Sequence, residues 1–162
     1  MTDEEFLSAF EACTLTDFHH RDHIKLAYLH LLRHPPEEAA AKVGAGLRKF
    51  AAFHGAPTDK LDVGYHETMT QAWVRLVHAT LCEYGPAESA DAFFEKQPQL
   101  AQKDSLRFFY TRDRLYSWQA KKEFIEPDLA PLPQSRKSAK FFQSSGIGSQ
   151  AKVANKQTAP DT

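Results

Sequence analysis

The chain has 162 residues, of which 42% are hydrophobic and 25% are charged, and its formal net charge is −1 at pH 7. This composition is typical of one ordinary globular domain with a real core. No apolar run approaches the roughly 18 residues of a membrane span, and the acidic start MTDEEFLSAF is unlike a signal peptide, so we expect a cytoplasmic protein without a membrane span.

Apolar residues recur at helical spacing along most of the chain, and no stretch alternates as a strand does. The pattern predicts an all-α bundle of about four main helices followed by shorter C-terminal ones. The main helices are expected at 3–13, 17–33, 36–54 and 63–84, and the shorter ones at 87–96, 104–110 and 113–124. Thr16 is the expected N-cap of the second helix, while Pro36, Gly55 and Gly85 are typical helix boundaries.

Charge divides the chain into two parts. Residues 134–162 carry five basic side chains against Asp161, a net charge of +4, so the preceding 133 residues carry −5. We expect 1–133 to form one all-α domain and 134–162 to be a disordered basic tail, because the latter is polar and lacks periodicity. The negative balance of the folded part argues against nucleic-acid binding.

Histidines gather in two short motifs. DFHHRDH, residues 17–23, contains His19, His20 and His23, and YHET, residues 65–68, contains His66. Short connections between helices predict antiparallel packing, which brings the starts of the second and fourth helices to one end of the bundle. Within the first motif, His20 and His23 are expected to face the core, while His19 points to solvent.

Two imidazoles one helical turn apart, joined by a third from a facing helix, would form a catalytic metal centre with an open position. The predicted ligands are His20, His23 and His66, with Glu67 as a fourth ligand or general base and Tyr65 in support. Imidazole ligands bind Zn, Fe, Cu and Ni, so the sequence does not identify the metal among these four. The sequence thus predicts a metal-dependent enzyme that acts on a small molecule, by oxidation or by hydrolysis or transfer.

The alternative is a non-catalytic helical binding or interaction protein whose histidines are structural or sense pH. Both motifs are short, and HETMT has Thr70 where the HExxH zinc proteases have their second histidine. In FYTRDRLYS, Arg112, Arg114 and Tyr110 are predicted to bind a substrate, with the arginines suited to an anionic group. In the competing interpretation, the arginines form surface ion pairs with nearby acidic residues and the tyrosine packs in the core.

F-x-H-x-x-H (Phe18, His20, His23), YHET and PDLAPLP (residues 127–133) together resemble a family of small bacterial helical proteins to which no activity is attached. The resemblance covers most of residues 15–133 and implies that these segments form one unit. A looser similarity is to the DinB-like metal-dependent transferases, which are bundles with three histidines at one end. Their histidine spacing differs from the one here, so this similarity implies the architecture alone.

Overall fold

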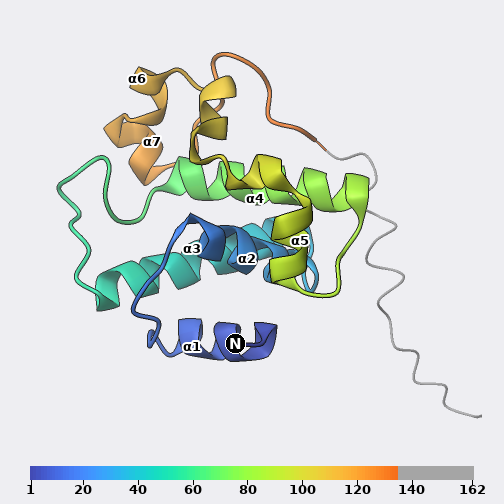
Figure 1. Ribbon diagram of the computed structural model, residues 1–162. Coiled ribbons are helices and arrows are strands. Elements are labelled where there is room, and N and C mark those ends of the chain that lie inside the picture. The colour runs from blue at the N-terminus through green and yellow to red at the C-terminus, as the bar shows by residue number, and fades with distance from the viewer. Residues whose placement is uncertain (135–162) are drawn as a thin grey trace, which may run out of the picture.

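The computed structural model describes residues 1–134, which form a bundle of helices without strands (Figure 1). The longer helices are α1 (Asp3–Glu11), α2 (His20–Leu31), α3 (Pro36–Phe53) and α4 (Glu67–Tyr84). The shorter elements are α5 (Ala90–Lys96), the 3-10 helices η1 (Pro98–Ala101) and η2 (Lys103–Phe108), α6 (Arg112–Leu115) and α7 (Trp118–Lys122). The predicted all-α fold is confirmed, whereas the predicted tail, apart from Gln134, lies outside the described residues.

Helix α2 begins three residues later than the sequence predicts. Thr16 was the expected N-cap, but the N-cap is His19 in an extended conformation, and the helix starts at His20. The backbone N–H of His19 donates to Oδ2 of Asp22 at 2.8 Å, which ties the carboxylate to the first turn. An acid at this position also suits the positive end of the helix dipole, so the local electrostatics favour the later start.

Helix α4 also begins later, at Glu67 instead of residue 63. The preceding loop contains Gly64, whose φ of 79° lies in the left-handed region that breaks a helix. The N-cap is His66, and its imidazole accepts the backbone N–H of Met69. This shift of start changes the direction of the His66 side chain, because an N-cap residue lies outside the helical periodicity.

Helix α3 has nearly the predicted bounds, whereas α5 begins at Ala90, three residues after the predicted start at residue 87. Pro36 opens α3, and Gly55 and Gly85, with φ of 65° and 76°, follow the ends of α3 and α4. The C-terminal helix expected at 113–124 is instead two short helices. Ser117 separates them, because its hydroxyl accepts the N–H of Ala120 and caps a new helix start.

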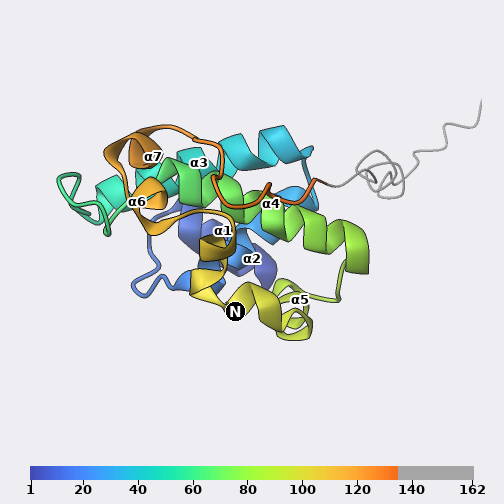
Figure 2. The same cartoon turned by 90° about the horizontal axis from the view of Figure 1, so that it is seen from above.

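Helix α4 lies in the middle of the molecule, with α2 and α3 on one side and α6 and α7 on the other (Figures 1 and 2). We call η2, α6, α7 and residues 123–134 the C-terminal layer. Two apolar cores result: a larger one formed mainly by α1, α2, α3, α4 and α5, and a smaller one between α4 and the C-terminal layer. Trp73 packs against both cores. In the described part of the chain, no helix is long and apolar enough to cross a membrane.

A buried cation fixes the N-terminal helix on the larger core. Lys25 on α2 is only 5% exposed, and its Nζ lies 3.2 Å from Asp3 at the start of α1 and 3.1 Å from Asp91 on α5. A buried charge requires such partners, since burial without them would cost several kcal/mol. Three helices are therefore joined at one point.

Candidate functional site

His66 uses both of its ring nitrogens inside the fold. The side chain is buried, its Nδ1 accepts the backbone N–H of Met69 at 3.2 Å, and its Nε2 lies 3.0 Å from the carbonyl oxygen of Leu115. A carbonyl oxygen only accepts, so Nε2 carries the proton and the ring is neutral. Burial lowers the pKa of His66, which favours the same neutral form. In this arrangement neither nitrogen retains a lone pair for a metal ion.

Thr68 lies next to His66 in the first turn of α4 and makes a second link to the C-terminal layer. Its side chain is fully buried, and the hydroxyl donates to the carbonyl oxygen of Glu123 at 2.8 Å. The same hydroxyl accepts the backbone N–H of Ile125 at 3.2 Å. His66 and Thr68 therefore anchor α6 and the segment after α7 to the start of α4.

Tyr65 and Glu67 make the corresponding contacts to α3. The Tyr65 hydroxyl donates to Oε2 of Glu67 at 2.6 Å, and Nη1 of Arg48 donates to both groups, at 3.1 and 3.0 Å. The remaining Glu67 oxygen accepts from Gln71 at 3.0 Å. Burial, together with the Glu67 hydrogen bond, raises the pKa of Tyr65. The two predicted catalytic groups are thus paired with each other and with Arg48.

His20 is oriented by the chain that follows α5. Its Nε2 lies 2.7 Å from the carbonyl oxygen of Leu100, and its ring meets that of Trp73 edge-on, with 4.6 Å between centroids. The carbonyl requires the proton on Nε2, so Nδ1 retains its lone pair. Burial lowers the pKa of His20 despite the hydrogen bond to Leu100, which acts in the opposite direction.

His23 lies beside His20 and packs edge-on against Phe18, with 4.7 Å between the ring centroids. Burial lowers the pKa of His23 to about 4, and the neighbouring His20 contributes in the same direction. His23 is therefore neutral at physiological pH. As predicted, His19 is exposed, while His20 and His23 turn toward the packed side of α2.

The structure does not bring His66 to the His20–His23 pair. Trp73, which His20 contacts, lies seven residues beyond His66, a rise of about 10 Å along a helix. His66 also turns to Leu115 in the C-terminal layer, because its extended backbone (φ −137°, ψ 110°) takes it off the helical face that the sequence predicted. Among residues 1–134, no group of three or more His, Cys, Asp or Glu side chains is placed to hold a metal ion.

The three predicted substrate-binding residues each contact a different partner within the fold. Tyr110 is fully buried in the smaller core, where its hydroxyl donates to the carbonyl oxygen of Ile125 at 2.9 Å. Burial raises the pKa of Tyr110 to about 12. Nε of Arg114 donates to the carbonyl oxygen of Glu126 at 2.6 Å, whereas Arg112 is exposed and lies over the ring of Tyr116. Of the three, only Arg112 has an exposed guanidinium group whose N–H donors are all left free by residues 1–134 to bind an anionic ligand.

Sequence reasoning missed Arg48 and Thr68. Arg48 has no motif of its own, and its partners lie 17 and 19 residues further along the chain. For Thr68 a signal exists: it stands four residues before Ala72, a spacing that puts both on one helical face, and both are fully buried. The motif YHET is therefore a junction of three parts of the chain, with Tyr65 and Glu67 facing α3 and His66 and Thr68 facing the C-terminal layer.

Comparisons of the chain with models of known families, with curated proteins and with solved structures find no match. The resemblance noted in the sequence stays a prediction, and the proposals that follow depend on the geometry alone.

Proposed function

We propose that the protein is a non-catalytic helical interaction protein in which the histidines are structural. The observation that carries this proposal is the use of both His66 ring nitrogens, one on the start of α4 and one on Leu115. A histidine with this pattern fixes two segments relative to each other and has no free atom for a substrate or metal.

The surroundings of His66 support the same interpretation. Glu67, the predicted general base, accepts hydrogen bonds on both carboxylate oxygens and is paired with Arg48. A general base needs an oxygen that can take a proton from a substrate, and these oxygens are directed to partners within the fold. The polar groups at this point connect helices, which is the behaviour expected of a scaffold.

The proposal is tested by combining metal analysis with unfolding measurements on the purified full-length chain. We expect substoichiometric Zn, Fe, Cu and Ni, and we expect His66→Ala to lower stability without changing metal content. His66→Asn, which keeps a side-chain cap acceptor, should lose less stability than His66→Ala. Stoichiometric metal that disappears in His66→Ala would overturn the proposal in favour of the three-histidine enzyme.

A metal-dependent enzyme that uses His20 and His23 is the second candidate, and one specific observation favours it. The hydrogen bond from His20 Nε2 to Leu100 leaves Nδ1 as a lone-pair donor, and a backbone carbonyl is a common outer partner of a metal-ligating histidine. His23 supplies a neutral neighbouring imidazole. Zn, Fe, Cu or Ni would be the cofactor, with the open positions left to water and a small substrate.

His19 provides the matched control for this second candidate, because it is adjacent to His20 but exposed. Titration calorimetry with Zn²⁺ or Ni²⁺ should show a site that His20→Ala and His23→Ala remove and His19→Ala retains. If wild-type protein binds neither ion, or if all three variants bind like wild type, the second candidate is rejected.

A further inference from the structure

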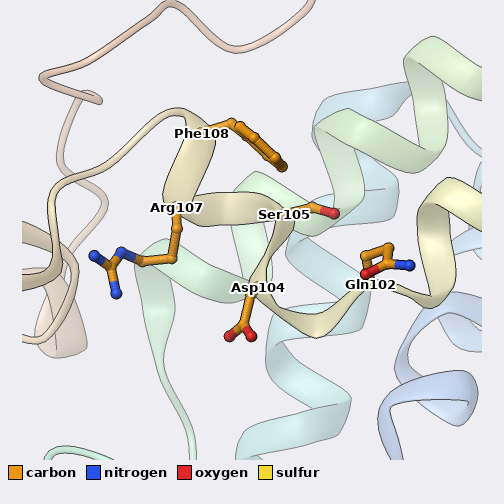
Figure 3. A pocket seen from close by; sticks show the side chains of 5 residues that line it. All are labelled: Gln102, Asp104, Ser105, Arg107 and Phe108. Carbon is orange, nitrogen blue, oxygen red and sulfur yellow. The ribbon is translucent and has the colours of Figure 1, made fainter.

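An open hollow of about 400 Å³ lies beside η2, and it is lined by Gln102, Asp104, Ser105, Arg107 and Phe108 (Figure 3). The side chains of Arg107 and Phe108 extend to different sides of η2, so the lining residues do not converge on one ligand (Figure 3). The lining includes one carboxylate and no histidine, which is too few ligands for a metal ion. Two histidines lie together elsewhere, at the end of α2.

His30 and His34 are one helical turn apart where α2 ends. The backbone N–H of His34 donates to the carbonyl oxygen of His30 at 2.9 Å, so α-helical spacing continues past Leu31 and places both side chains on one side. Their ring centroids are 5.9 Å apart. Two imidazoles that bind one ion with bonds of about 2.0–2.1 Å have ring centres roughly 5–6 Å apart. The two rings therefore already have the spacing of ligands to a shared ion.

The hydrogen bonds of the two rings leave nitrogen atoms unused. Nδ1 of His34 lies 3.0 Å from Oε1 of Glu38, in the first turn of α3. The carboxylate only accepts, so Nδ1 carries the proton and Nε2 keeps a lone pair. A carboxylate in this position is a common outer partner of a metal-ligating histidine, because it fixes the tautomer and the ring orientation.

His30 also differs from His66, whose two ring nitrogens are both bonded within the fold. Nδ1 of His30 is buried, and it has no hydrogen-bond partner among residues 1–134. A neutral imidazole always has a lone pair on one nitrogen, so the His30 ring can act as a ligand without breaking a hydrogen bond at Nδ1. The pair thus offers a metal ion what His66 does not.

The surroundings of His30 favour its neutral form, which is the form that binds metal. Burial lowers the pKa of His30 to about 4, and the neighbouring His34, Arg33 and Lys42 contribute in the same direction. The two permanent cations are compensated, because Arg33 pairs with a glutamate of α1 and Lys42 lies 3.7 Å from Glu38. Their repulsion of an added metal ion is therefore weakened.

We propose that His30 and His34 together bind one divalent transition-metal ion of the class of Ni²⁺, Cu²⁺ and Zn²⁺, with water in the remaining positions. Imidazole nitrogen is a preferred ligand of these ions, whereas Mg²⁺ and Ca²⁺ prefer oxygen. His34 binds through Nε2 and stays hydrogen-bonded to Glu38, so the ion connects the end of α2 to the start of α3. Rotation of each ring about χ2, a soft torsion, aims its nitrogen at the ion. The inference goes beyond the proposed function and is independent of it, because that proposal rests on His66.

The test adds Ni²⁺ or Zn²⁺ to the full-length chain after treatment with a chelator, and follows binding by titration calorimetry and stability by thermal unfolding. We expect binding and a higher melting temperature, because only the folded chain presents both ligands, and no response to Mg²⁺. His30→Ala and His34→Ala should each weaken Ni²⁺ binding at least tenfold, and Glu38→Gln should weaken it about tenfold through the outer partner. His54→Ala is the matched control, since His54 is exposed after the end of α3, and should bind like wild type.

Three outcomes overturn the inference. They are wild type that binds neither ion, His34→Ala that binds like wild type, and loss of binding in His20→Ala and His23→Ala instead, which would assign the ion to the other end of α2. Circular dichroism without metal checks the fold of each variant. If His30→Ala does not fold, His34→Ala decides, because the side chain of His34 is 27% exposed and lies outside the cores.

Discussion

The imidazole of His66 donates its Nε2–H to the carbonyl oxygen of Leu115, 49 residues further along the chain. The contact joins the first turn of α4 to the end of α6, and the neighbouring Thr68 hydroxyl adds two more hydrogen bonds to the segment after α7. The C-terminal layer is thereby held in place by polar contacts as well as by the smaller core.

Removing the His66 ring should be costly. In His66→Ala, the Leu115 carbonyl oxygen and the Met69 N–H lose their partners in a buried region, which should lower the free energy of unfolding by about 2–4 kcal/mol. Urea unfolding followed by circular dichroism measures this change. His19→Ala is the control and should stay within about ±0.5 kcal/mol of wild type. Equal, small effects of both substitutions would contradict the structural role of His66.

Thr68→Val tests how much the Thr68 hydroxyl contributes to stability, because the volume of the side chain stays nearly the same. The substitution keeps the shape but removes the donor to Glu123 and the acceptor for Ile125, so we expect a loss of about 1–3 kcal/mol. Thr80→Val is the matched control, because the Thr80 hydroxyl only donates back to the carbonyl of Leu76 within its own helix. Thermal unfolding should separate the two variants clearly, and a Thr80→Val loss as large as that of Thr68→Val would reject the assignment.

His23 should make the protein less stable in acid. Its folded pKa of about 4 lies below the value of about 6.5 for an exposed histidine. The unfolded chain therefore binds a proton first as the pH falls, and stability is lost between about pH 6.5 and pH 4. His23→Leu removes this contribution, so the difference in unfolding free energy between variant and wild type should shift toward the variant by about 3 kcal/mol from pH 7 to pH 4. Parallel stability curves over this range would show that His23 does not titrate as described.

Gly44 on α3 leaves room for the Tyr65 hydroxyl. A Cβ at this position would lie 2.9 Å from that oxygen, which Glu67 and Arg48 hold in place. Gly44→Ala should therefore cost about 1–2 kcal/mol, although alanine is the better helix former. In a Tyr65→Phe background the clash is gone, and the same substitution should stabilise by roughly 0.5–1 kcal/mol. A double-mutant cycle without this change of sign would mean that Gly44 has another role.

The helices could be predicted from sequence because their apolar spacing and their proline and glycine boundaries act locally. The starts of α2 and α4 could not, since the spacing of apolar residues does not show which residue caps a helix. The N-cap of α2 is His19 instead of Thr16, and the backbone N–H of His19 donates to Asp22. Helix α4 begins after His66, because Gly64 has a positive φ that interrupts the preceding turn.

The part of the candidate site that lies within one helix could be predicted, because helical spacing is a local property. The shared direction of His20 and His23 follows from helical periodicity, whereas His19 is the extended N-cap before α2 and lies outside that periodicity. The orientation of His66 depends on a single extended residue and on a carbonyl oxygen that reaches it only in the folded molecule. No local pattern contains that information, so the expected three-histidine set could not be checked before the fold was known.

The position of α4 between two cores also decides which changes of chain length the fold can accept. One residue inserted after Trp73 would rotate the rest of α4 by about 100°. The side chains of that part of α4 would then no longer point into either of the two cores. An insertion between Thr58 and Lys60 would fall in an exposed loop and leave every helix in register. Related chains should therefore vary in length in that loop and keep the length of α4 constant.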